Sequence, residues 1–208
     1  MTTGTRAVRT RDPDRRDRIL RAAADLLAER GYHGVSMADI GGAAGIVGSG
    51  VYRHFDSKAA VLVALLDDVM DRLQLSADLA ATSQNPVDLV LRDLVGAQVA
   101  FAIDDRALLR LYLREAHNLP ENDQRRLRRR QRRYLEEWMH VLLELRPQLD
   151  DGVARTLVHS AFGSIQSVAA HRSGLPRHQM HELLESVALA CLFADDPSTA
   201  NNETSALT

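Results

Sequence analysis

Apolar residues recur every three or four positions along most of this 208-residue chain, which is the period of an amphipathic α-helix. No convincing alternation of apolar and polar residues suggests a half-buried β-strand. The periodic segments are separated by glycine, proline and asparagine, which continue a helix poorly. The pattern therefore predicts an all-α fold of about nine helices, near residues 13–30, 36–45, 48–54, 57–73, 86–103, 106–116, 121–145, 151–171 and 176–194.

The second predicted helix is short and rich in glycine. Ser36 followed by Asp39 resembles a capping box that opens it, and Gly45 is placed to end it. Gly41 and Gly42 fall in its interior, where each costs up to about 1 kcal/mol relative to alanine. We therefore expect packing, rather than intrinsic propensity, to hold this helix.

Residues 36–58 predict two short helices joined by a glycine-containing turn and followed by the start of a longer helix. This is the layout of a helix-turn-helix, here at about 36–55, which places its second helix in the major groove of DNA. Lys58 follows the motif and is the only lysine among 26 basic residues. Because a flexible ammonium suits a phosphate, we expect Lys58 to contact the DNA backbone.

Charge is distributed unevenly along the chain. The net charge is −2, yet residues 1–60 contain ten basic and seven acidic residues and carry +3, which leaves −5 for the remainder. A basic head on an acidic body fits DNA binding confined to one end. We see no apolar run near the ~20 residues that a membrane-spanning helix needs, and no signal peptide, and expect a cytoplasmic protein. The single cysteine, Cys191, excludes an intramolecular disulfide.

From about residue 13 to residue 75 the sequence resembles the tetracycline-repressor (TetR) family of bacterial transcription regulators. The resemblance rests on the stretch SMADIGGAAGIVGSGVYRHFDSK at 36–58, the preceding helix that ends in Gly-Tyr, and the run of nine helices. It implies a homodimer that binds a pseudo-palindromic operator and is released by a small effector, in most cases as a repressor. The expected parts are a flexible basic arm (1–12), a DNA-binding domain (13–73), a ligand-binding and dimerisation domain (74–195) and a disordered tail (196–208).

The resemblance implies DNA contacts at the matching positions. The start of the second helix and the polar side chains around the third would meet phosphates, and the third helix would face the bases. The expected DNA-binding residues are Ser36, Met37, Gly48, Ser49, Gly50, Tyr52, Arg53, His54 and Lys58. Because glycines leave few side chains for reading bases, Arg53 is the main candidate for a base contact, with a phosphate contact as the alternative.

Val47 departs from the family, which usually has a small hydroxyl residue at this position to cap the recognition helix. Gly48 or Ser49 must then serve as the cap. DNA shape and the arginines of the N-terminal arm can supply part of the specificity. Those arginines are Arg6, Arg9 and Arg11.

The most basic stretch lies outside the head, in QRRLRRRQRRYLEE at 124–137. Its apolar residues share one helical face and its arginines cover the others, with Arg132–Glu136 and Arg133–Glu137 at i,i+4 spacing. A solvated helix face is the favoured interpretation. A site for an anionic group, such as the phosphates of a coenzyme A thioester, is the alternative.

Polar and aromatic side chains on otherwise apolar helices indicate a pocket inside the bundle, although a plain core with satisfied polar tips has the same pattern. The pocket candidates are Leu66, Met70, Phe101, Tyr112, Glu115, His117, Gln131, Tyr134, Trp138, Phe162 and Gln166. The last two helices carry small and apolar residues on long faces, which the family uses to dimerise. The interface candidates are Leu157, Ala161, Ile165, Leu183, Leu184, Val187 and Ala190.

Other functions have weaker support in the sequence. His178 and His181 have a spacing that could ligate a metal, but surface histidines are the favoured interpretation, and we expect neither a metal nor a cofactor. The sequence contains no phosphate-binding glycine loop and no nucleophile elbow. We therefore expect a DNA-binding regulator whose partners are operator DNA and a small effector, apolar or like an acyl thioester. A ligand-independent architectural DNA-binding protein and, more weakly, a helical-bundle enzyme are the alternatives.

Overall fold

The structure is a computed structural model that describes residues 14–46 and 48–196. The predictions for the arm at 1–12, for Val47 and for the tail from residue 197 onward lie outside these residues. The described chain is all-α and contains no strand. Its elements are α1 (Asp14–Arg30), α2 (Met37–Ala43), the 3-10 helix η1 (Gly48–Arg53), α3 (Lys58–Ala81), α4 (Val87–Asp104), α5 (Arg106–Glu115), η2 (Ala116–Asn118), α6 (Glu121–Leu145), α7 (Asp151–Gln166), η3 (Ser167–Ala169) and α8 (Arg177–Leu192).

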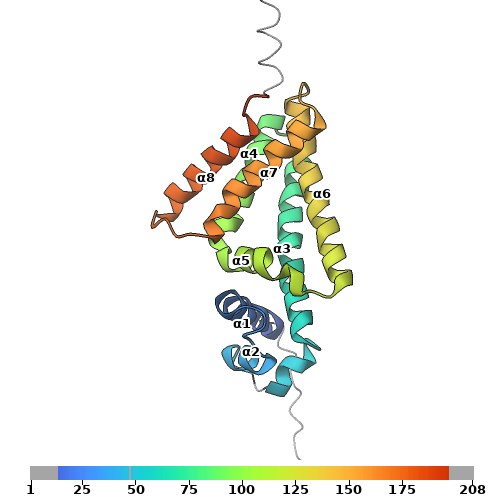
Figure 1. The fold of residues 1–208 in the computed structure, drawn as a ribbon, viewed down its shortest axis with the longest axis vertical. Helices are drawn as coiled ribbons and strands as arrows, with labels where there is room; N and C mark the ends of the chain where they lie inside the picture. Colours follow the sequence, from blue (N-terminus) through green and yellow to red (C-terminus); the bar gives the residue numbers. More distant parts are fainter. Residues whose placement is uncertain (1–13, 47, 197–208) are drawn as a thin grey trace, which may run out of the picture.

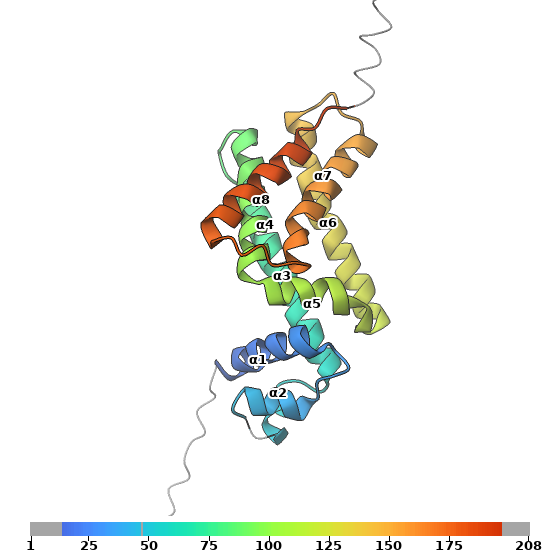
Figure 2. The same ribbon diagram turned by 60° about the vertical axis from the view of Figure 1, so that its left-hand side comes forward.

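The helices form a small head and a larger body that share one long helix. Figure 1 shows α1 and α2 at one end and α4, α6, α7 and α8 at the other, with α3 running from the head into the body. Seen from the side in Figure 2, α5 lies across the molecule between α1 and the body. Contacts of α1 with α5 and of α3 with α4 and α6 join the two parts. None of the described helices is long and apolar enough to cross a membrane.

The predicted helix ends agree with the structure because local chemistry determines them. Gly31 and Gly45 have φ of 73° and 66°, a left-handed backbone that ends α1 and the α2 turn without steric cost. The head has its own core beneath these turns, in which Ile19, Ile40 and Val51 are completely buried.

Three elements differ from the sequence prediction. The helix expected at 151–171 ends at Gln166 and is followed by the short 3-10 helix η3. The third predicted helix is a 3-10 helix, η1, instead of an α-helix. The fourth, α3, ends at Ala81 and not near Leu73, so the expected domain boundary at residue 73 falls inside a continuous helix. The extension is held because Ala77 and Ala80 continue the buried stripe of α3, and no glycine or proline interrupts the chain before Thr82.

Candidate DNA-binding surface and effector cavity

The start of α2 is built by the predicted capping box. The Ser36 hydroxyl accepts a hydrogen bond from the Asp39 backbone N–H at 3.1 Å, and the Asp39 carboxylate accepts one from the Ser36 backbone N–H at 2.8 Å. The Ser36 hydroxyl also donates a hydrogen bond to the Asp39 carboxylate at 2.5 Å, and this bond, together with the one from the Ser36 backbone N–H, holds the pKa of Asp39 below its usual value. The Ser36 N–H, predicted to meet a phosphate, is therefore already engaged. In the first turn of α2, only the N–H groups of Met37 and Ala38 remain available.

The predicted contact residues divide into exposed and buried groups. Tyr52, Arg53 and His54 are exposed on and beside η1, as a DNA-facing element requires. Met37 is buried, so its side chain belongs to the core of the head and only its backbone can meet DNA. A Cβ on Gly50 would lie 2.5 Å from the Ile46 Cγ2 atom, so this glycine is required by the packing of η1 against the preceding turn.

Lys58 is engaged inside the head. Its Nζ donates to the backbone carbonyls of Tyr32 and Val35, the latter at 2.7 Å, and it lies 4.3 Å from the centre of the Tyr32 ring. These contacts tie the start of α3 to the connection between α1 and α2. An ammonium has three donors, so one remains for the predicted phosphate contact.

A cavity of about 140 Å³ lies in the body, between α3, α4, α5, α6 and α7. We call it the effector cavity. A dry cavity of similar volume holds a molecule of the size of benzene. The apolar part of its wall consists of Val69, Met70, Leu73, Phe101, Leu109, Leu135, Phe162 and Gly163. Its polar wall residues are Gln98, Tyr112, Gln131, Tyr134, His159 and Gln166.

Two polar groups of the cavity have unused hydrogen-bonding capacity. Gln98 is only 2% exposed, and its carbonyl oxygen accepts a hydrogen bond from the Tyr134 hydroxyl at 3.0 Å. Within the described residues, neither the amide nitrogen of Gln98 nor the Tyr112 hydroxyl makes a hydrogen bond. Burial raises the pKa of Tyr112 to about 12, so this hydroxyl keeps its proton at neutral pH. Both groups can donate to an oxygen of a bound molecule.

Seven of the pocket candidates line this cavity, and four lie elsewhere. Leu66 is buried in the core of the bundle, and Trp138 is fully buried behind the wall, where its ring packs against Phe162 with 4.7 Å between centroids. Glu115 accepts a hydrogen bond from Asn118, and His117 borders a separate surface groove. Periodicity assigns a residue to a face of its helix, but it does not decide which neighbouring helix that face meets.

Sequence reasoning missed Gln98 and His159 as polar wall residues. Gln98 is the only polar side chain among the buried residues of α4, and a lone polar position in a long apolar stretch could have identified it. No comparable pattern distinguishes His159, which becomes a wall residue only because α7 packs against α6.

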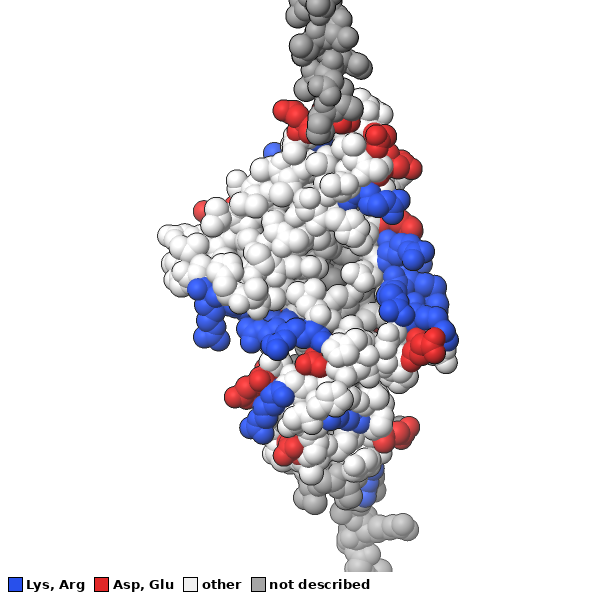
Figure 3. All heavy atoms as spheres, viewed as in Figure 1, with Lys and Arg blue, Asp and Glu red and all other residues white. Residues whose placement is uncertain are grey.

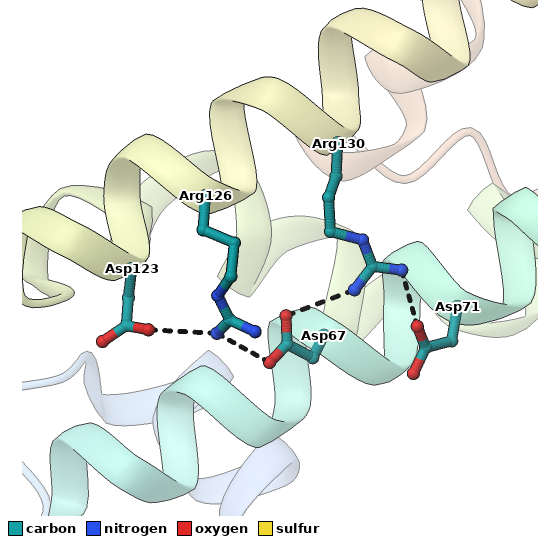
Figure 4. A network of polar contacts seen from close by, with 5 residues as sticks. All are labelled: Asp67, Asp71, Asp123, Arg126 and Arg130. Carbon is teal, nitrogen blue, oxygen red and sulfur yellow. Dashed lines mark hydrogen bonds and ion pairs between the residues drawn. The ribbon is translucent and has the colours of Figure 1, made fainter.

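Part of the arginine stretch of α6 is neither a bare solvated face nor an anion site. Figure 4 shows Asp67 of α3 between Arg126 and Arg130, with Asp123 and Asp71 completing the network. The Asp67 carboxylate lies 2.9 Å from the Arg126 guanidinium and 3.3 Å from that of Arg130. These ion pairs join α6 to α3 on the outside of the bundle. Of the two i,i+4 pairs expected within α6, Arg133–Glu137 is present at 3.8 Å, while Arg132 and Glu136 form no ion pair in the described chain.

The interface candidates on α7 and α8 also divide into two groups. Leu157, Ala161, Ile165 and Leu184 are buried within the subunit, because α7 packs against α8 and α8 against α4, so they are core residues and not free surface. Leu183, Val187 and Ala190 are exposed. The face over α7 and α8 carries few charged side chains in the view of Figure 3.

Comparisons with known proteins agree with this architecture. The sequence profile described as bacterial regulatory proteins, tetR family, matches residues 19–65. The chain is 33% identical over 152 residues to the HTH-type transcriptional repressor KstR2 of Mycolicibacterium smegmatis. The matched region covers 65% of this chain and 70% of KstR2.

Two solved structures have a similar fold. A TetR-family transcriptional regulator from Bordetella parapertussis 12822 has a TM-score of 0.80 and 25% identity, covering 88% of this chain and 96% of that protein. The structure of AibR in complex with isovaleryl coenzyme A and operator DNA has a TM-score of 0.71 and 21% identity. The match covers 83% of this chain and 96% of AibR. At this identity the second similarity concerns the fold alone.

Proposed function

This chain belongs to the TetR family of DNA-binding transcriptional regulators, and from that premise we propose that it is a homodimeric repressor released from its operator by a small effector. Family membership makes it a regulator and not an enzyme. We assign residues 13–73 to DNA binding and 74–195 to effector binding and dimerisation, with the cytoplasm as the place of action. The effector is a compact apolar or acyl-thioester-like molecule that fills the effector cavity.

The continuity of α3 carries this proposal. At its first residue, Lys58, the helix is bonded to the connection between α1 and α2 in the head. Three turns later, Val69, Met70 and Leu73 of the same helix form part of the wall of the effector cavity. A molecule that enters the cavity and displaces this wall therefore shifts the N-terminal end of α3 and, with it, η1.

The effector must bind the released state more tightly than the DNA-binding state. A shift of the DNA-binding state from 99% to 1% of the population requires that the effector favour the other state by about 5.5 kcal/mol. Burying a compact apolar group and satisfying the donors of Gln98 and Tyr112 contribute to this difference only if the cavity is wider in the released state than in the bound state.

The proposal can be tested with the purified full chain and a labelled operator selected from genomic DNA. Trp138 is the only tryptophan, and it packs against Phe162 of the cavity wall, so a compound that enters the cavity should change its fluorescence. The same compound should raise the melting temperature and lower operator affinity, measured by fluorescence anisotropy.

The variant Gly163→Leu is the matched control for this experiment. A Cβ on Gly163 meets nothing within 4 Å, and the residue lines the cavity, so leucine should occupy the effector's space and abolish the fluorescence response. A compound that alters Trp138 fluorescence and stability while leaving operator affinity unchanged would contradict the proposal. That result would favour a ligand-independent architectural DNA-binding protein.

A further inference from the structure

A cationic groove adjoins the effector cavity on the outside of the body, between α6 and α7. It has a volume of about 280 Å³, and its wall includes Arg128 and Arg132 of α6 and Arg155 of α7. We call it the arginine groove. It lies next to the effector cavity, because the side chains of Gln131, Leu135 and His159 line both.

The positive charge of the groove is largely uncompensated. Within the described residues, Arg132 and Arg155 form no ion pair or hydrogen bond, and Arg128 makes only a long contact of 3.5 Å to the Gln124 side chain. Glu136 is the one carboxylate in the wall, against three guanidinium groups. Arg126 and Arg130, on another side of the same helix, are by contrast paired with aspartates of α3 (Figure 4).

This difference separates two uses of arginine along α6. Figure 3 shows a band of basic side chains along this helix. Two of the arginines of α6, Arg126 and Arg130, hold the helix on α3 through their ion pairs with Asp67. The guanidinium groups in the groove have no such internal use. Planar guanidinium groups with free N–H donors bind phosphate and carboxylate oxygens in two-pronged geometry.

We infer that the arginine groove binds the phosphate-bearing head of the effector while the effector cavity holds its apolar end. The inference rests on the proposed effector function of the cavity. The cavity accepts about six carbon atoms, and the unused donors of Gln98 and Tyr112 suit a carbonyl oxygen beside the apolar group. Because the groove has twice the volume of the cavity, it suits an anion larger than a carboxylate. The effector class is thus a short acyl group joined to a phosphorylated carrier.

The test uses isothermal titration of the full chain with four probes: hexanoyl-coenzyme A, coenzyme A, hexanoate and hexan-1-ol. Hexanoyl-coenzyme A should bind at least tenfold more tightly than each of the others, because only this probe fills both the cavity and the groove. Its affinity should fall as salt is raised, since the head is bound by charge. Hexanoate binding as tightly as hexanoyl-coenzyme A would overturn the assignment of a phosphorylated head.

The double variant Arg132→Gln, Arg155→Gln tests the groove itself. It should weaken hexanoyl-coenzyme A at least tenfold and leave hexan-1-ol unchanged. Arg129→Gln is the matched control, because Arg129 is exposed on the same helix but outside the groove. Circular dichroism and the melting temperature of each unliganded variant establish that it is folded.

The outcomes distinguish this inference from the proposed function. If the double variant binds hexanoyl-coenzyme A as the parent does, while hexan-1-ol still binds the cavity, the groove does not hold the head and only the inference fails. If neither hexan-1-ol nor hexanoyl-coenzyme A binds the parent, the cavity is not an effector site and both fail. Equal binding of coenzyme A with and without its hexanoyl group would show that the head binds alone, which overturns the joint site.

Discussion

Single side chains in the head serve packing as much as recognition. Lys58, the only lysine, is bonded to two backbone carbonyls that lie 26 and 23 residues before it in the chain. Gly50 is needed where a Cβ would meet Ile46. Arg53, by contrast, is exposed at the end of η1 and makes no ion pair within the described residues. Arg53 therefore stays the main candidate for a contact with a base.

Lys58→Met should destabilise the protein by about 1–3 kcal/mol, because it keeps the apolar stem but leaves the carbonyls of Tyr32 and Val35 without their charged donor. Urea denaturation measures the loss. Arg16→Met, which removes an exposed cation 5.4 Å from the Phe55 ring, is the control and should cost less than about 0.5 kcal/mol.

If the third donor of Lys58 meets a phosphate, Lys58→Met should reduce the slope of log operator affinity against log salt concentration by about 0.9. An unchanged slope would leave Lys58 a role in folding alone.

Arg53→Ala should relax operator specificity at one base pair in each half-site, with a loss of about 1–3 kcal/mol for the preferred base. Anisotropy against operators substituted at single positions measures the change. His54→Ala, an exposed neighbour expected to contact phosphate, should instead weaken all operators alike. Uniform weakening by Arg53→Ala would assign this guanidinium to the DNA backbone.

At the scale of elements, tertiary contacts decide where local propensity is weak. The short α2 contains two glycines and is held by its capping box and by the burial of Ile40. The long α3 is joined to α6 by the ion pairs of Asp67, in addition to the apolar contacts between the helices. A single substitution in α2 or α3 can therefore test one of these stabilising interactions separately from the others.

Gly42→Ala should stabilise the protein by about 0.5–1 kcal/mol. Gly42 is exposed, its backbone is regular and an added Cβ meets nothing within 4 Å, so only the conformational freedom of the unfolded chain changes. Gly45→Ala is the matched control: its Cβ is equally free of contacts, but its φ of 66° makes alanine unfavourable by about 1 kcal/mol. Urea midpoints that move in the same direction for both variants would contradict this account.

Asp67→Asn and Arg130→Gln should be coupled by about 0.5–1 kcal/mol in a double-mutant cycle, because both side chains are largely shielded, with exposures of 25% and 27%. The cycle for Arg133 and Glu137 is the control. That pair is longer and Arg133 is 78% exposed, so its coupling should be below about 0.5 kcal/mol. Equal coupling in the two cycles would remove the distinction between the helix-joining arginines and the solvated ones.

At the scale of the whole molecule, the proposed dimer needs a surface that one subunit leaves open. The exposed residues Leu183, Val187 and Ala190 form a stripe along α8, and the exposed Thr156 and Ser160 lie on the neighbouring α7. Uncharged faces of this kind suit the isologous interface of a twofold dimer, in which the same helices of both subunits pack together. Two heads would then face successive half-sites on one side of the operator.

Leu183→Glu should convert the dimer into a monomer, because it places a charge in the centre of this face. Sedimentation velocity measures the mass of the particle. Affinity for the full operator should fall when the dimer is lost, because the two heads are then no longer joined. Leu79→Glu is the control: Leu79 is even more exposed, at 64% against 52%, but it lies on α3, away from the α7–α8 face. A dimer that survives Leu183→Glu would place the interface on another surface.

Local sequence patterns were enough to predict the class of the fold and the ends of most helices, because these depend on neighbours within a few residues. The apolar period and the caps at Ser36 and Gly45 act locally, and they predicted the eight α-helices of the described chain. The family resemblance likewise rests chiefly on neighbouring residues, in the stretch at 36–58 and the helix that precedes it. The prediction was wrong for η1, because a short glycine-containing segment has little helix propensity. It was also wrong for the end of α3, because no glycine or proline marks an end near residue 73.

The neighbours of each helix face, by contrast, became known only from the packing of the helices in the bundle. It placed Gln98 and His159 beside the cavity and moved Glu115 and His117 away from it. It also divided the arginines of α6 between ion pairs to α3 and the open groove. The physical reason is that such contacts join residues far apart in the chain, and they depend on how each helix is rotated and packed in the bundle. The period of a single helix identifies its buried face but not the helices that this face meets.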